Sequence, residues 1–184
     1  MLTKWNRVHS EYLFKKDKLI IRKDDCELAN GKIITPCYVF EFPDWVNVFA
    51  LTKYEELILV KQYRHAFGDV VIELPGGWIK PSDASEEVAV KRELVEETGY
   101  TIDKIIKLGS ISPNPALNSN LLHMFLATDA MLSTSIMPDE DEEIEILLVP
   151  INEVLNMLKN STLINNGHVT CIFYALYRLG YLKT

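Results

Sequence analysis

The sequence lacks any concentration of positive charge. It has 19 Lys and Arg residues against 26 Asp and Glu, which gives a net charge of −7, and no run of basic residues stands out. Nucleic-acid binding depends on cationic surfaces that neutralise phosphates, so this composition argues against a nucleic-acid partner. A small phosphate substrate stays open, because a bound metal ion can reverse the local charge.

Long apolar runs and a cysteine framework are also missing. No apolar stretch approaches the roughly 20 residues that span a membrane, and Met1–Trp5 opens no signal peptide. The 3 cysteines are odd in number and have no metal-type spacing, which favours a reduced protein. We therefore expect a cytoplasmic protein without a membrane partner. Its 184 residues suffice for a real core.

Three glutamates close together on a predicted helix are the most informative feature. Glu93, Glu96 and Glu97 precede Gly99, a natural helix C-cap, and at about 100° per residue they share one face. Repulsion and the helix dipole disfavour them there by roughly 0.3–1 kcal/mol each. A hard divalent cation would relieve this strain, because it prefers carboxylate oxygens. A solvated face with Arg92 paired to Glu96 is the alternative.

The residues ahead of this helix favour the metal site. A strand-like run at 70–74 leads into the double glycine Gly76–Gly77. After a polar loop, Asp83 with Glu86 three residues on resembles a capping box and predicts the helix start. A strand, a glycine turn, a capped helix, an acid cluster and a glycine stop form a much rarer combination than any one of them.

The whole region resembles the Nudix box, G-x5-E-x7-R-E-U-x-E-E-x-G-U, in which U is apolar or aromatic. Residues 92–100, RELVEETGY, match its second half at every fixed position. In the first half, the glutamate position falls on Asp83 when counted from Gly77 and on Ala84 when counted back from Arg92. The loop is therefore one residue longer than the pattern, and aspartate replaces glutamate.

Further motifs resemble the branch of this family that cleaves ADP-ribose and nucleoside diphosphate sugars. They are Q-Y-R at 62–64, E-L-P-G-G at 73–77, Pro115 sixteen residues after Gly99, and E-E-I-E at 142–145. One departure is Ala116, where that branch often has glycine. The resemblance spans about residues 35–180 and implies an α+β fold, the Nudix α/β/α sandwich with a mixed sheet, in residues 46–184.

Residues 1–45 predict an N-terminal β-rich arm ahead of that domain. Asn30–Gly31 is a strong hairpin signal before a strand at 33–42. Because an extended arm is a common dimer contact, we expect a homodimer. Trp5 and Trp45 are candidates for stacking on a nucleobase, with packing in a core or interface as the alternative.

The remaining sequence predicts more strands and two late helices. Strands are expected at 46–50, 57–62, 105–111, 121–127 and 144–149, and amphipathic helices at 152–158 and 168–179. His123 lies in one of these strands, where a lone histidine is more often a packing or hydrogen-bonding residue than a base. The helices are expected to cover the sheet and to have no catalytic part.

The resemblance implies a metal-dependent hydrolase that cleaves ADP-ribose or a related nucleoside diphosphate sugar to a nucleoside monophosphate and a sugar phosphate. The implied ligands of Mg²⁺ or Mn²⁺ are Glu93, Glu96, Glu97 and the backbone carbonyl of Gly76. Arg92 would orient the glutamates. Metals that bridge phosphate oxygens polarise phosphorus and lower the pKa of a bound water.

Residues outside the box complete the implied site. A carboxylate of the acidic loop, Glu143 or Glu142, would accept the proton of the attacking water, although such acid runs are usually solvated. Arg64 would hold the substrate, or else make a surface salt bridge. Pro115 belongs to a stiff loop on the substrate side.

Two other functions stay open. A Nudix hydrolase of other diphosphates, such as dinucleotides or nucleoside triphosphates, is one, and the proline loop weighs against it. The other is a catalytically silent Nudix domain that binds ADP-ribose. The complete set of box acids weighs against that alternative, because a silent domain is expected to lose them.

Overall fold

The computed structural model describes residues 2–135 and 143–182. Its packing divides the chain into two compact units, each described by itself below. The first comprises Met1–Pro43 and Ser112–Leu121, and the second comprises Asp44–Ile111 and Leu122–Thr184. The expected division into domains at residue 45 stays a prediction.

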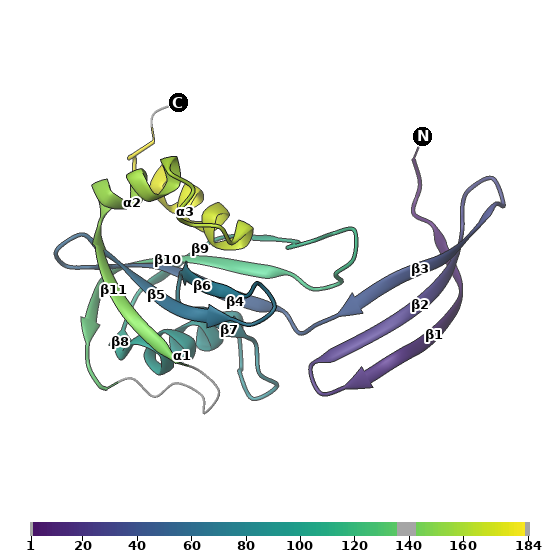
Figure 1. The fold of residues 1–184 in the computed structure, drawn as a ribbon, viewed down its shortest axis with the longest axis horizontal. Helices are drawn as coiled ribbons and strands as arrows, with labels where there is room; N and C mark the ends of the chain where they lie inside the picture. The colour runs from purple at the N-terminus through teal and green to yellow at the C-terminus, as the bar shows by residue number, and fades with distance from the viewer. Residues whose placement is uncertain (1, 136–142, 183–184) are drawn as a thin grey trace. The chain divides into compact units, whose positions relative to one another are not determined.

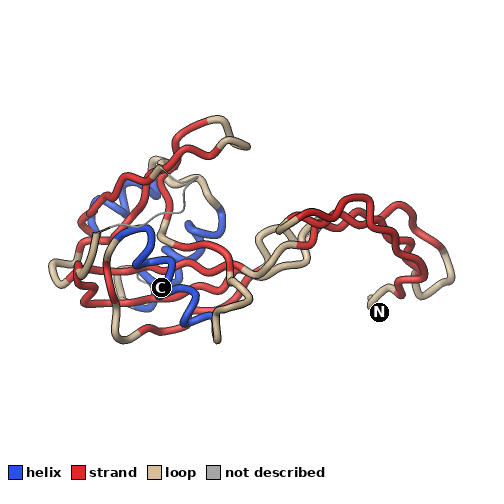
Figure 2. Tube along the Cα trace, turned by 90° about the horizontal axis from the view of Figure 1, so that it is seen from below, coloured by secondary structure: helices blue, strands red, loops and turns tan. Residues whose placement is uncertain are grey.

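The first unit is a three-stranded antiparallel sheet, and strands make up most of it (Figure 2). Its strands pair in the order β1 (Asn6–Lys16), β2 (Leu19–Glu27) and β3 (Ile33–Glu41). The predicted turn at Asn30–Gly31 joins β2 to β3. Gly31 has a φ of 80° there, a left-handed conformation that glycine adopts without steric cost. The β-rich arm expected from the sequence therefore consists of two hairpins that share β2.

Strand β1 has no counterpart among the strands that the sequence predicts. All 11 of its residues are exposed, so the alternation of buried and exposed side chains that signals a strand is absent. Backbone pairing with β2 holds it, together with a hydrogen bond of 2.6 Å from the Ser10 hydroxyl to the buried Asp24 carboxylate. The Phe40 N–H donates to the Leu117 carbonyl at 2.8 Å, which ties a distant loop to this unit.

The second unit is built on a mixed sheet, as predicted. Its strands are β4 (Trp45–Thr52), β5 (Glu56–Arg64), β6 (Asp69–Glu73), β7 (Gly76–Trp78), β8 (Tyr100–Thr101), β9 (Ile105–Ile111), β10 (Leu122–Leu132) and β11 (Ile144–Pro150). The order along the sheet is β11-β5-β4-β10-β8, with β6 on β5, β7 on β4 and β9 on β10. Strand β10 runs parallel to β4, and the other pairs are antiparallel.

One helix covers one face of this sheet and two cover the other (Figure 1). The helices are α1 (Glu86–Thr98), α2 (Ile151–Lys159) and α3 (Asn166–Arg178). Side chains alternate along β4, so Val48 packs under α1 and Phe49 packs under α2 and α3. Each such burial contributes about 1.5–3 kcal/mol. No helix of the described residues is both long and apolar enough to cross a membrane.

Helix α1 ends as predicted but begins differently. Gly99 is the C-cap, with a φ of 71°. The predicted capping pair of Asp83 and Glu86 is wrong, because the N-cap is Ser85, whose side chain accepts a hydrogen bond from the first turn. The Asp83 side chain is instead bonded to Arg92.

Candidate active site

Gly76 and Gly77, predicted to form a turn, instead open strand β7 after a bend at Pro75, because they pair with β4. This bend and the two glycines, called the glycine turn below, contact the acid helix directly. The backbone N–H of Gly76 donates to the Glu97 carboxylate at 2.9 Å, and only 2% of Glu97 is exposed. A Cβ added to Gly77 would lie 2.7 Å from the carboxyl carbon of Glu93, and one added to Gly76 would lie 2.2 Å from the Val46 carbonyl oxygen. A side chain at Gly76 would therefore clash with the backbone of β4, and one at Gly77 would displace the Glu93 carboxylate.

Arg92 lies on the face of α1 that carries Glu93, Glu96 and Glu97, called the acid face below, and it donates hydrogen bonds to two of these acids. Its Nε and Nη2 donate to the two Asp83 oxygens at 3.0 and 2.8 Å. Nη2 also donates to the Trp78 carbonyl at 3.0 Å, and Nη1 donates to Glu93 and Glu96 at 2.6 and 2.9 Å. Each of its five N–H donors thus has an acceptor. The hydrogen bonds to Asp83 are the main reason that the pKa of Arg92 is raised.

The same contacts show where the extra residue of the box lies. Asp83 follows Gly77 at the spacing of the pattern and makes the two-pronged contact with Arg92, whereas Ala84 is exposed. The insertion therefore follows Asp83, between the loop and the helix. Hydrogen bonds from Arg92 lower the pKa of Asp83, and the Lys80 N–H adds a further one at 2.8 Å. Aspartate here anchors Arg92 at the position of the box glutamate.

Negative charge exceeds positive charge on this face. Four carboxylates, those of Asp83 and the three helix glutamates, lie beside the two cations Arg92 and Lys80. The Lys80 amine lies 3.4 Å from a Glu96 oxygen. Burial raises the pKa of Glu93, although Arg92 opposes the shift. A bound cation would stabilise the ionised form of Glu93.

The chemistry of these groups fits a divalent cation. Carboxylate and backbone carbonyl oxygens are the donors that hard cations prefer, and the missing Cβ of Gly77 lets the Glu93 carboxylate lie directly against the β7 backbone. Within residues 2–135 and 143–182, no three His, Cys, Asp or Glu side chains already converge as a metal site. Glu93 and Glu96 are bonded to Arg92, and Glu97 to the turn. Metal binding would therefore require these acids to turn toward one point.

Arg64 belongs to a second polar network, which surrounds Glu73 at the end of β6. The Glu73 carboxylate, only 3% exposed, accepts hydrogen bonds from Arg64 at 2.7 and 2.8 Å. Gln62 and Asn165 donate to the same carboxylate at 3.3 and 2.7 Å. Burial acts to raise the pKa of Glu73, but the charge of Arg64 and the hydrogen bonds from Asn165 and Arg64 contribute to lowering it. The salt bridge weighed for Arg64 thus exists, with a buried partner.

His168 fixes the glycine turn from the first turn of α3. Its Nδ1 accepts a hydrogen bond of 2.8 Å from the Leu74 N–H, which requires that nitrogen to be unprotonated. Burial lowers the pKa of His168 to about 4, against the opposite influence of Glu73. The ring is therefore neutral at pH 7. Sequence reasoning misses this residue, because the contact joins positions 94 apart and follows no local pattern.

Replacing His168 with asparagine, which can accept the same hydrogen bond but does not titrate, should flatten the acid dependence of stability. The folded-state pKa of about 4 lies below the ordinary value of 6.5. The unfolded chain therefore binds the proton first, and stability is lost as the pH falls through this window. Between pH 7.5 and 5 this loss is about 2 kcal/mol in the unsubstituted protein. Urea unfolding at both pH values measures the difference.

The control for this experiment is His65→Asn, at an exposed histidine. It should leave the difference between the two pH values unchanged. If His168→Asn and the unsubstituted protein lose the same free energy of unfolding between pH 7.5 and 5, the buried neutral imidazole is contradicted.

The predicted stacking residues have different surroundings. Trp45 packs edge-to-face on Trp78, with ring centroids 5.6 Å apart and an interplanar angle of 88°. Trp45 therefore makes a packing contact, and its role in stacking on a base stays a prediction. Trp78 follows the two glycines in β7, and the sequence signal that points to it is an aromatic residue next to two glycines. Trp5 belongs to the first unit and is 47% exposed.

The other predicted residues lie in loops. Pro115 is exposed in the loop that packs with the first unit. Glu143 is exposed directly ahead of β11, and Glu142 lies outside the described residues. His123 is a hydrogen-bonding residue, as predicted, because its Nδ1 lies 2.7 Å from the Ser110 hydroxyl.

A mixed sheet between one acid-bearing helix and two further helices, with a glycine turn pressed against the acids, defines a Nudix-type sandwich. The NUDIX domain family model matches residues 42–167, and the chain belongs to this family.

Two curated relatives are named as pyrophosphatases. The chain is 30% identical over 154 residues to "ADP-ribose pyrophosphatase" of Bacillus subtilis (strain 168), and the match covers 83% of this chain and 82% of the relative. It is 28% identical over 131 residues to "GDP-mannose pyrophosphatase" of Escherichia coli (strain K12), covering 67% of this chain and 68% of the relative.

A solved structure described as "Crystal structure of ADP compounds hydrolase" shares the fold. Its TM-score is 0.85, at 21% sequence identity, and the superposition covers 99% of both chains. The likeness extends over both units of the chain and confirms the predicted fold class.

Proposed function

We propose that this chain hydrolyses the diphosphate bond of ADP-ribose or a related nucleoside diphosphate sugar. The products are a nucleoside monophosphate and a sugar phosphate. The observation that carries the proposal is the acid face of α1, fixed to the glycine turn through Gly76 and Glu97 and organised by Arg92. The relatives named for ADP-ribose and GDP-mannose support the substrate class.

A divalent metal ion belongs to this proposal, with Mg²⁺ or Mn²⁺ as the candidates. Its ligands would be the carboxylates of Glu93, Glu96 and Glu97 and the carbonyl of Gly76. When bound, such an ion supplies charge neutralisation for the diphosphate and makes a water more acidic.

The chain's own groups prepare the site. Arg92 holds Glu93 and Glu96, and the Gly76 N–H holds Glu97, so all three acids are kept on one side of α1, from which they would turn toward a bound ion. Glu143, exposed ahead of β11, accepts the proton of the attacking water, with Glu142 as the alternative base.

Substrate recognition falls to residues at other positions. Glu73 engages Nε and Nη2 of Arg64, which leaves Nη1 for a phosphate or ribose oxygen, and the Arg64 side chain is 45% exposed. Trp45 and Trp5 are the proposed stacking surfaces for the base, and Pro115 shapes the substrate side. The roles of Arg64 and Pro115 follow from the family resemblance, and those of the two tryptophans follow from the ability of their rings to stack on a base. Substitution of each residue tests its role.

The functional molecule in this proposal is a cytoplasmic homodimer joined through the N-terminal arm. Strand β1 is an edge strand with exposed apolar side chains, among them Val8, Tyr12 and Phe14. An edge of this kind is a ready surface for a second chain. Three free cysteines fit a reducing compartment. Sedimentation equilibrium should give twice the chain mass of 21.1 kDa.

The test of the proposed reaction is a substrate panel with Mg²⁺ or Mn²⁺. ADP-ribose, GDP-mannose, other nucleotide sugars, dinucleotides and nucleoside triphosphates are each incubated with the protein. Released nucleoside monophosphate is then measured. Turnover of a nucleotide sugar is expected. Preference for triphosphates or dinucleotides would overturn the assigned substrate class. Tight binding of ADP-ribose without any product would point to a catalytically silent domain.

A further inference from the structure

Lys80 differs from the other cation of the acid face in how it is held. Its amine makes a single contact of 3.4 Å with Glu96, and both side chains are partly exposed, at 34% and 29%. That distance exceeds the usual 2.7–3.2 Å of a hydrogen bond. The charge of Lys80 also acts on Glu93. Its backbone N–H is anchored separately, to Asp83 at 2.8 Å, so the loop can stay in place while the side chain moves.

Arg92 has no comparable freedom. All five of its N–H donors are engaged, and its main partner, the Asp83 side chain, is only 4% exposed. Removing Arg92 from this position would leave a buried carboxylate without its cation. Lys80, on a flexible four-carbon stem, is therefore the cation that can leave Glu96.

We infer that Lys80 is a positioning residue that neutralises Glu96 before a divalent ion binds and then contacts the diphosphate of the substrate. This inference rests on the proposed function. A divalent ion and the ammonium group repel each other when both lie beside Glu96. Metal binding therefore displaces the amine, and an anionic diphosphate attracts it. Lys80 thus makes the metal bind less tightly alone and couples metal binding to diphosphate binding.

The test is calorimetric titration of Mn²⁺ into the full-length protein and into Lys80→Met. Titrations are made with and without the non-hydrolysable probe adenosine 5′-(α,β-methylene)diphosphate. Without the probe, Lys80→Met should bind Mn²⁺ about three- to tenfold more tightly. The gain in Mn²⁺ affinity that the probe produces should shrink by a similar factor, because the ammonium group no longer bridges the two events. Lys80→Arg keeps the charge and should stay close to the unsubstituted protein.

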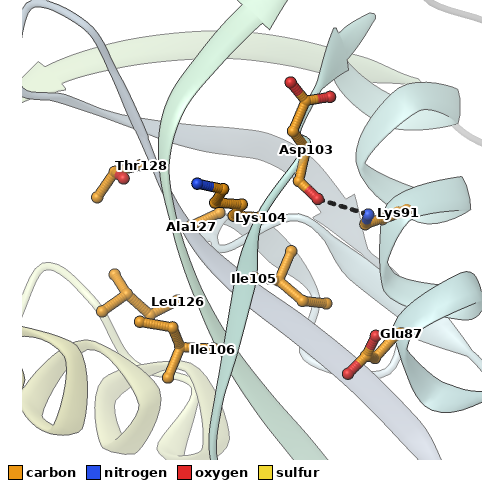
Figure 3. Close-up of a pocket in the computed structure, with 9 residues that line it drawn as sticks. All are labelled: Glu87, Lys91, Asp103, Lys104, Ile105, Ile106, Leu126, Ala127 and Thr128. Atoms are coloured by element: carbon orange, nitrogen blue, oxygen red, sulfur yellow. Dashed lines mark hydrogen bonds between the residues drawn. The ribbon is translucent and has the colours of Figure 1, made fainter.

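The matched control is Lys91→Met, on the same helix as the acids. Lys91 lies roughly 140° around the helix from Glu96. Figure 3 shows its amine directed at the Asp103 carbonyl, 2.8 Å away, beside a separate cavity of about 510 Å³. Lys91→Met should leave both Mn²⁺ affinities unchanged.

The outcomes separate this inference from the proposed function. Equal Mn²⁺ affinity in Lys80→Met and in the control, with an unchanged effect of the probe, would overturn the role of Lys80 and leave the hydrolase intact. Absence of Mn²⁺ binding in every variant would overturn the metal site and the role of Lys80 with it. Thermal unfolding in EDTA checks that each variant is folded.

Discussion

Replacement of Glu97 by glutamine should lower kcat/KM for nucleotide-sugar hydrolysis by at least about 10³-fold, while the protein stays folded. Loss of one anionic ligand removes several kcal/mol of charge stabilisation in the transition state. The amide oxygen of glutamine can still accept the hydrogen bond from Gly76 that Glu97 accepts at 2.9 Å. Removing one of three like charges should leave stability equal or slightly higher in EDTA. Steady-state kinetics and urea unfolding measure the two effects.

The control for Glu97→Gln is Glu87→Gln. Glu87 lies on the same helix, is exposed and lines the separate cavity beside Lys91. Its replacement should change kcat/KM by less than about twofold, as expected for a surface substitution. Turnover of Glu97→Gln within tenfold of the unsubstituted protein would contradict the assignment of Glu97 as a metal ligand.

Replacement of Arg92 by alanine should lower the free energy of unfolding by about 3–5 kcal/mol, the range for breaking a buried ion pair. The substitution leaves Asp83 without the guanidinium that donates to both of its oxygens. It also removes the hydrogen bonds from Arg92 to Glu93 and Glu96. Activity should fall with stability, because the acids lose the group that orients them. Urea unfolding in EDTA at pH 7 gives the free energy without a contribution from metal.

A matched substitution is Arg178→Ala, at an exposed arginine in the last turn of α3. It should change the free energy of unfolding by less than about 1 kcal/mol. A comparably small change in Arg92→Ala would mean that the five hydrogen bonds of Arg92 contribute little to the fold. Asp83→Asn, which keeps the shape of the partner but removes its charge, should give an intermediate loss.

Local sequence was enough to predict the central part of the candidate site. The acids on one face and the glycine stop follow from spacing within one stretch, and each depends on neighbouring residues. The two glycines lie in strand β7 and not in a turn, because they pair with the distant β4. The start of α1 was mispredicted for a non-local reason. Asp83 is a good N-cap by type, but Arg92, 9 residues further on, offers two charge-assisted hydrogen bonds, and Ser85 caps the helix instead.

Other features could not be read from the sequence because their cause is distant or absent from the pattern. Glu73 is satisfied by Asn165, 92 residues away, and no periodicity links the two. Strand β1 exposes every residue, so it carries no buried face for the alternation rule to detect. The strands of the second unit were predicted more closely, because most of them carry an apolar core such as Val48, Phe49 and Phe125.

The hydrogen bond from Leu74 to His168 has a consequence for how the molecule is made. During synthesis from the N-terminus, the box and its acids leave the ribosome well before the first turn of α3. The Leu74 N–H therefore lacks its acceptor, and Glu73 one of its donors, until the last part of the chain has emerged. A nascent chain stalled before residue 165 should hold the motif in full, yet the segment that leads into Gly76 gains its last hydrogen bonds only with the closing helix.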